Sequence, residues 1–176
     1  MSRVASERVH GAGTDDAARD GAGARAEAVA AVAHGLEALG TLLGPLLADR
    51  SISGECAMHV VVMDPVADPR TTPFDDAVLA ERSFGDAATW QADYASYARA
   101  KTRLAWRERM SLRTLFAEHP ERLREDDIRV EGAVHAGRWT VGASGAQAWY
   151  DHAIATIAIA LFDAAAEHAR RSAATR

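Results

Sequence analysis

The segment from Val130 to Ile159 constrains the fold most, because two short β-rich stretches, a glycine turn and a long apolar helix follow one another in it. We expect strands at 128–133 and 138–143, joined by a tight turn in which Gly137 supplies a positive φ. A second turn, Ser144-Gly145, precedes the helix. A strand, a glycine turn and a helix in this order direct backbone N–H groups beyond the strand end, which favours the binding of an anion.

Lys101 supplies a positive charge for such an anion site. It falls in a predicted helix over 87–108, on a side that the spacing of apolar residues marks as buried, so its ammonium group either reaches out to water or points at the glycine turn. In the second case the ligand-binding residues are Lys101, Gly142, Ser144, Gly145 and Asp151. Asp151 also has a purely structural explanation, since a carboxylate in the first turn of a helix is stabilised by the helix dipole.

Three histidines are candidates for chemistry, and each also has a structural explanation. His135 is either an exposed hairpin residue or an acid–base group at the mouth of a pocket. His152 could contact a bound carboxylate or a neighbouring subunit, and His34 lies beside the apolar stripe of the first helix. The sequence has no serine–histidine–aspartate pattern, P-loop, HExxH motif or cysteine cluster. Catalysis by His135 or His152 is therefore a hypothesis, and the spacing of His135, Asp151 and His152 matches no known metal-ligand motif.

The rest of the chain predicts one α/β domain. Residues 1–23 contain almost no large apolar side chain, which predicts a flexible N-terminal tail, and residues 24–170 form the domain. A helix over 24–48 has apolar residues at helical spacing. The apolar run at 57–63 predicts a strand buried on both faces, and a second strand follows at 76–84. Together with the elements named above, this order gives an α+β fold with a mainly antiparallel sheet flanked by helices.

Composition and charge limit the classes of partner. The chain has 48% hydrophobic and 26% charged residues and a net charge of −5, without a basic cluster of the kind that binds nucleic acid or anionic membranes. No run approaches the ~20 apolar residues of a membrane span, and the first residues lack the apolar core of a signal peptide. A single cysteine excludes an intrachain disulfide. These features predict a cytoplasmic protein without a nucleic-acid or membrane partner.

Two blocks of the sequence resemble the GlcG/HbpS-like family, also called the haem-degrading-domain family. The first block is Val-Leu-Ala-Glu-Arg-Ser-Phe-Gly-Asp at 78–86, followed by Tyr-Ala-Arg-Ala-Lys at 97–101. The second is Thr-Val-Gly-Ala-Ser-Gly at 140–145, with an Asp-His pair opening the helix behind it. The order and spacing of these blocks carry the resemblance, which covers about residues 58–166.

The resemblance implies a profilin-like sheet with helices packed on it, assembled into homo-oligomers, and a small-molecule or anionic ligand. Relatives are linked to haem binding or haem degradation, so haem is one candidate cofactor, with His34 as the candidate haem ligand. The resemblance does not fix a ligand, because other relatives are linked to corrinoid, propanediol and glycolate metabolism.

Three classes of function follow from these observations. The first is a small-ligand-binding protein of the GlcG/HbpS type. The second is an enzyme that acts on a small organic acid or degrades haem, with His135 or His152 as general base. The third is a non-catalytic assembly module. In that case the last helix, which is apolar around its circumference between Ala153 and Ala169, forms the interface of a homo-oligomer.

Overall fold

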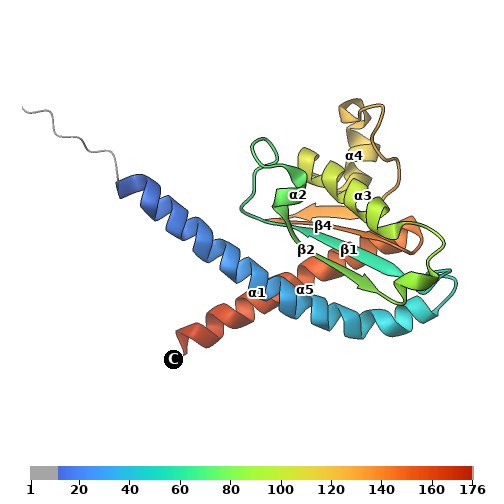
Figure 1. Ribbon diagram of the computed structural model, residues 1–176, viewed down its shortest axis with the longest axis horizontal. Helices are drawn as coiled ribbons and strands as arrows, with labels where there is room; N and C mark the ends of the chain where they lie inside the picture. The colour runs from blue at the N-terminus through green and yellow to red at the C-terminus, as the bar shows by residue number, and fades with distance from the viewer. Residues whose placement is uncertain (1–11, 176) are drawn as a thin grey trace, which may run out of the picture.

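The fold is a four-stranded antiparallel sheet flanked by helices (Figure 1). A computed structural model describes residues 12–175. The strand order is β2-β1-β4-β3, and each neighbouring pair is antiparallel. The predicted fold class, a single α+β domain with a mainly antiparallel sheet, is confirmed. In chain order the elements are α1 (Ala12–Ala48), β1 (Met58–Met63), α2 (Phe74–Ala77), β2 (Val78–Phe84), the 3-10 turn η1 (Ala87–Thr89), α3 (Tyr94–Glu108), α4 (Leu112–Glu118), the 3-10 turn η2 (Pro120–Arg122), β3 (Ala133–Ala136), β4 (Trp139–Ser144) and α5 (Ala148–Ala174).

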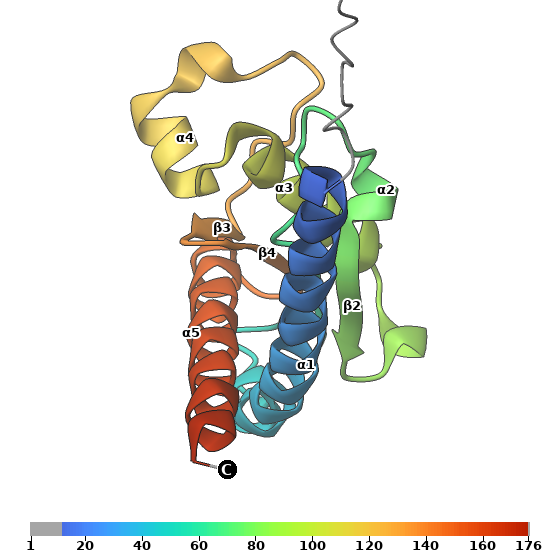
Figure 2. The ribbon, with the colours of Figure 1, turned by 90° about the vertical axis from the view of Figure 1, so that its left-hand side faces the viewer.

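The two central strands, β1 and β4, are buried along their whole lengths because helices cover both faces of the sheet. α3 lies on one face, and α1 and α5 lie side by side on the other (Figures 1 and 2). Side chains alternate accordingly. In β1, Val60 and Val62 pack with α1 and α5, whereas Val61 and Met63 pack with α3. This arrangement explains the uninterrupted apolar run that predicts a strand at 57–63.

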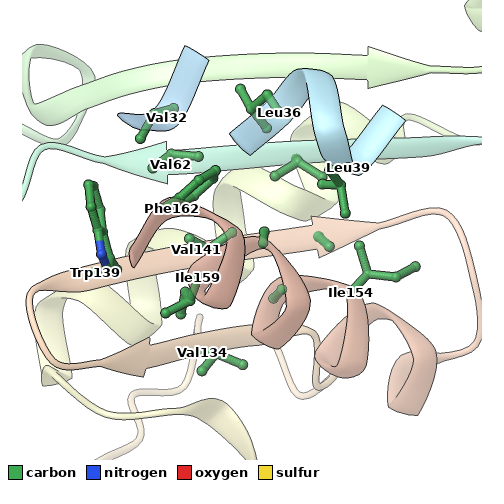
Figure 3. Packing of buried hydrophobic residues seen from close by; sticks show 14 of the residues in the cluster. Val32, Leu36, Leu39, Val62, Val134, Trp139, Val141, Ile154, Ile159 and Phe162 are labelled. Atoms are coloured by element: carbon green, nitrogen blue, oxygen red, sulfur yellow. The ribbon is translucent and has the colours of Figure 1, made fainter. Parts of the chain in front are cut away.

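The larger part of the hydrophobic core lies between the sheet and the α1–α5 pair (Figure 3). The two helices approach closely where Gly35 meets Phe162, because a Cβ atom at Gly35 would overlap the Phe162 ring. That ring packs edge-on against Trp139, with centroids 5.4 Å apart. The indole Nε1 of Trp139 in turn donates a hydrogen bond to Asp163 at 2.7 Å. These contacts fix how the α1–α5 pair sits on β4.

Helix α1 begins twelve residues before the predicted start at Ala24. Residues 12–23 of the predicted flexible tail are therefore helical, and residues 1–11 lie outside the described part of the chain. The prediction rested on the absence of large apolar side chains in this segment. Once the packed part of α1 is formed, however, each further residue adds one hydrogen bond without a new nucleation cost, and alanine favours the extension.

The 20–48 segment of α1 is, by length and composition alone, long and apolar enough to cross a membrane. The prediction that no run of residues approaches the length of a membrane span did not anticipate this segment. A third of the most apolar window is buried inside the fold, and the buried residues face α5 and the sheet. A helix packed into a protein core passes the same test, so this feature by itself is weak support for a membrane partner.

The helix predicted over 87–108 is divided in the structure. The Asp86 carboxylate accepts from the N–H of Ala88 at 3.0 Å and caps only the short turn η1. The long helix α3 starts later, at Tyr94, where Asp93 accepts from the N–H of Ser96 at 2.9 Å. Two acidic caps seven residues apart thus compete for the same helix start, and the sequence pattern did not distinguish them.

The prediction of a strand at 128–133 is wrong. The strand β3 runs from Ala133 to Ala136 and contains His135. Ile128 packs against the apolar cluster between α3 and α4 instead of joining the sheet. Gly132, with a φ of +128°, then breaks the extended conformation just before β3. The hairpin turn shrinks to two residues, with Ala136 opposite Trp139, and Gly137 has the positive φ that was predicted, +57°.

Candidate functional site

Lys101, Ser144 and Asp151 meet at the end of β4, as one of the two sequence-based alternatives predicted. The Nζ atom of Lys101 lies 2.7 Å from Oδ2 of Asp151, 3.2 Å from the carbonyl oxygen of Ala143 and 3.3 Å from Oγ of Ser144. The side chains of Lys101 and Asp151 are each only 2% exposed. An ammonium group has three N–H donors, and these three oxygens use all of them. Lys101 therefore does not reach out to water.

Close approach of the backbone makes room for this buried pair. A Cβ atom at Gly132 would lie 2.8 Å from the Lys101 Nζ and 2.8 Å from the Ala143 oxygen, so only glycine fits beside the amine. Gly145, with a φ of +142°, brings the turn after β4 against the backbone of Ala57. Gly142 lies under α3, where a Cβ atom would overlap the Thr102 hydroxyl. The predicted glycines thus serve packing around the Lys101–Asp151 pair.

The turn after β4 binds an anion that the chain itself supplies. The Oδ1 atom of Asp151 accepts from the N–H of Ala146 at 2.9 Å. Burial raises the pKa of Asp151 to about 6, against the opposing effects of Lys101 and of the N–H groups of Gly145 and Ala146. The N–H donors and the ammonium group that were expected to hold a ligand are therefore occupied by Asp151. Binding of an external anion at this turn stays a prediction.

Lys101 is the only lysine in the sequence, whereas arginine provides all the other basic side chains among the 20 lysine and arginine residues. A compact ammonium group suits a buried site with three separate acceptors better than a planar guanidinium does. The presence of a single lysine is therefore the feature of the sequence that distinguishes Lys101 from a surface residue. The predictions made from the sequence did not use this feature.

His59 forms a second polar group on the α3 face of the sheet. Its Nδ1 lies 2.9 Å from Oγ of Ser83 and its Nε2 lies 3.2 Å from Oε2 of Glu81. The ring packs edge-on against Trp90. Burial lowers the pKa of His59, and nearby Arg99 lowers it further. His59 is therefore a buried histidine of the sheet whose two ring nitrogens both have polar partners.

His135 lines a small polar pocket at one end of the sheet. At this end β1 and α3 both end and the β3–β4 hairpin closes. The pocket has a volume of about 110 Å³. The Nδ1 atom of His135 lies 2.8 Å from Oγ1 of the buried Thr140. Burial lowers the pKa of His135, and the neighbouring charge of Arg109 lowers it further. Of the two alternatives for His135, a fully exposed hairpin residue does not fit this arrangement, and a role in acid–base chemistry stays a prediction.

Three charged residues complete this pocket. Arg109 caps the C-terminus of α3 with a left-handed backbone (φ +50°). Its side chain is 57% exposed, and its nearest acidic partner, Asp68, is 3.6 Å away. Asp64 is buried and paired with Arg25 at 2.5 Å, and Arg138 is paired with Glu27 at 3.0 Å. The pocket therefore offers one loosely paired cation, Arg109, beside a neutralised carboxylate and a second cation that already has a close partner.

His152 lies on α5 in different surroundings from His135. Burial lowers the pKa of His152, and the nearby Arg113 lowers it further whereas Glu131 raises it. The Nδ1 atom of His152 is buried and has no hydrogen-bond partner within the described residues. No group of three or more histidine, cysteine, aspartate or glutamate side chains suited to a metal ion occurs between residues 12 and 175. The structure thus separates His135 from the Asp151–His152 pair.

His34 is exposed on α1 and lines a groove between α1 and α5 together with His168. The groove walls are mostly alanine side chains, with the imidazole groups of His34 and His168 beside them. Such a surface suits an apolar molecule. Its volume is about 220 Å³, below the roughly 300–1,000 Å³ of pockets that enclose drug-sized molecules. Haem binding at His34 stays a prediction.

Sequence reasoning missed most of the pocket around His135. Asp64 and Arg109 were not among the site residues predicted from the sequence. The left-handed backbone of Arg109 depends on how α3 ends, which the sequence does not reveal.

Comparisons of the chain with models of protein families and with curated proteins find no match. The resemblance to the GlcG/HbpS-like family therefore rests on the residues of the two sequence blocks alone.

Proposed function

We propose that the protein binds a small anionic ligand, of carboxylate or phosphate size, in the pocket around His135. In this proposal it is a small-ligand-binding protein of the kind that the resemblance to the GlcG/HbpS-like family implies. The observation that carries the proposal is the position of Arg109, an exposed cation at the rim of a pocket that also contains the ring of His135.

The chemistry of the pocket supports a small anion. Arg109 presents a guanidinium group, which pairs with carboxylate and phosphate oxygens through two parallel hydrogen bonds. Thr140 and His135 supply polar atoms beside it. A volume of about 110 Å³ is several times the ~30 Å³ that one water molecule occupies in the liquid. This is room for an acid of a few heavy atoms.

The alternative site at Lys101 is less suited to binding a small anion. Its amine is buried and its three donors are occupied, so a ligand there would have to displace Asp151. Arg109 is only loosely paired at 3.6 Å, and its exposed side chain reorients at small cost. An incoming anion therefore meets an accessible cation at the His135 pocket and an occupied one at Lys101.

Isothermal calorimetry with inorganic phosphate, acetate and acetamide tests the proposal. Acetamide has nearly the shape of acetate without its charge. We expect the wild-type protein to bind at least one of the two anions and not acetamide. Arg109→Gln should weaken that binding by about tenfold or more, because a hydrogen bond to a charged group contributes about 1.5–3 kcal/mol.

Arg50→Gln is the matched control. Arg50 is exposed near the other end of β1 and contacts only the Gly54 oxygen, at 3.5 Å. This variant should bind the anion as the wild type does. Equal binding by wild type and Arg109→Gln, or an equal loss in both variants, would refute the assignment of the site.

A second candidate function is an enzyme that acts on a small organic acid, with His135 as general base. The lowered pKa of His135 favours it, because a general base must be neutral at the working pH. His152, whose pKa is also lowered, is the other candidate base. Turnover of a bound acid that survives His135→Ala but not His152→Ala would exclude His135, and turnover that survives the double substitution would exclude both.

A further inference from the structure

A second, larger cleft lies between the C-terminal half of α1 and strand β2, at the edge of the sheet. Its volume is about 600 Å³, within the range of pockets that bury organic ligands. Its residues are distinct from those of the His135 pocket. The proposed small-anion function therefore leaves this cleft without a role.

Two glycines of α1 form one wall of this cleft. Gly40 and Gly44 are four residues apart and lie on the same side of the helix. Glycine is a poor helix former, so its use here needs a reason. At Gly40 the reason is packing, because a Cβ atom would lie 3.1 Å from the Phe84 ring. At Gly44 the reason is the following Pro45, whose ring clashes with the Cβ atom of a preceding residue in the helical conformation. An added Cβ atom would meet nothing else within 4 Å, so the missing side chain adds to the open space.

The lining combines an apolar surface with one cation. Leu43 and Leu47 of α1 are buried beneath the cleft, and the Phe84 ring of β2 stands beside them. The guanidinium group of Arg82 lies over that ring, 5.2 Å from its centroid. Arg82 also pairs with Glu37 at 2.6 Å, but the Glu37 side chain is 74% exposed. A ligand with an acidic group can therefore replace Glu37 at Arg82 without leaving a buried carboxylate unpaired.

The far end of the cleft is formed by Cys56 and Gly85, which approach each other through their backbones. Cys56 has a φ of +52°, a conformation that is uncommon for residues other than glycine. A Cβ atom at Gly85 would overlap the Cys56 oxygen. Because Cys56 is the only cysteine in the sequence and is half-buried in the cleft wall, its thiol reports on whether the cleft is occupied.

We propose that this cleft binds an amphipathic organic anion, with a flat apolar body against Leu43, Leu47 and Phe84 and one acidic group on Arg82. The inference is independent of the proposed small-anion site, since it uses a different pocket and a ligand too large for that pocket.

Fluorescence titration with 8-anilinonaphthalene-1-sulfonate tests the proposal, because this probe has a flat apolar body and a single anionic group. Thr41→Leu places a larger side chain in the cleft from an exposed position of α1, and leucine favours the helix more than threonine does, so the fold is retained. Ala33→Leu is the matched control, since Ala33 is also exposed on α1 and lies outside the cleft. We expect Thr41→Leu to weaken probe binding by about tenfold or more and Ala33→Leu to leave it unchanged.

The charge assignment has its own control in N-phenyl-1-naphthylamine, which lacks the sulfonate. Arg82→Gln should weaken binding of the sulfonate probe and leave binding of the uncharged probe unchanged. Saturating sulfonate probe should also slow the reaction of Cys56 with N-ethylmaleimide. Wild-type affinity in Thr41→Leu, or an unprotected Cys56, would overturn the cleft as the binding site. Equal effects of Arg82→Gln on both probes would overturn the anionic class of the ligand.

Discussion

Replacing Lys101 with methionine should strongly destabilise the fold, because it leaves the buried carboxylate of Asp151 without its cation. At the observed Nζ–Oδ2 distance of 2.7 Å, two unit charges interact by about 6 kcal/mol at an effective dielectric constant of about 20. Part of this energy offsets the cost of burying the ammonium group, a cost that the variant no longer has. Removing one partner of a buried pair therefore costs about 3–5 kcal/mol, and we expect a loss of free energy of unfolding in that range at pH 8.

The loss should be smaller at pH 5 than at pH 8. The pKa of Asp151 in the folded protein, about 6, lies above its ordinary value of 3.8, so the fold favours the protonated carboxyl. Stability from this group is thus fully present below about pH 4 and declines as the pH rises through 6. Without Lys101, which lowers the pKa of Asp151, that pKa rises further. At pH 5 the variant then avoids the unpaired charge by keeping the proton.

Urea unfolding followed by circular dichroism at pH 5 and pH 8 measures both effects. Asp151→Asn is the matched partner, since the amide oxygen can still accept from the Ala146 N–H while the charge is removed. In the double variant Lys101→Met/Asp151→Asn the loss should be smaller than the sum of the two single losses. A Lys101→Met protein within about 1 kcal/mol of the wild type at pH 8 would refute the reasoning, because so small a loss is typical of exposed ion pairs.

Three further predictions concern other parts of the fold. Gly35→Ala should destabilise the protein by about 1–3 kcal/mol in thermal unfolding, because the added methyl group overlaps the Phe162 ring; unchanged stability would mean that α1 and α5 do not approach there. Lys101 should resist acetylation by an amine-reactive ester in the native protein and react in urea, as peptide mass spectrometry can show; rapid native labelling would contradict its burial. We also propose a homo-oligomer through α5, in which Ile157, 42% exposed, lies in the interface. Ile157→Asp should then give a smaller species in size-exclusion chromatography with unchanged circular dichroism, and an unchanged elution volume would remove α5 as the interface.

The proximity of Ser144 and Asp151 could be predicted because it follows from local order. A strand that ends in a glycine turn before a helix places these two residues close together wherever the segment lies in the fold. The position of the Lys101 amine could be given only as one of two alternatives. It depends on how α3 lies across β4, and on Gly132, whose missing Cβ atom lets the amine approach.

The same distinction applies to the last helix. Its composition suggested an apolar surface all around, with Phe162 as part of an interface. The structure places Phe162 in the core and leaves Ile157 exposed. Alanine occurs on both the buried and the exposed side of α5. The periodicity of the large apolar side chains is therefore too weak to show which side faces the sheet.

The pocket around His135 depended on contacts that no local pattern encodes. Asp64, Arg109 and Thr140 come from three separate elements, and Arg109 enters the pocket only because it caps α3 with a left-handed backbone. His135 was itself placed in a turn, whereas it is a strand residue paired with Thr140. One histidine of the pocket was therefore identified, and its charged partner was not.

The most direct test of the proposed function is an NMR titration of the His135 imidazole signals with inorganic phosphate and with acetate. We predict that one of these anions shifts the His135 signals saturably and raises the pKa of His135, because a bound negative charge favours the imidazolium. The signals of His59, which is buried at another site, should stay unchanged. His135 signals that do not move at any concentration of either anion would contradict the proposal.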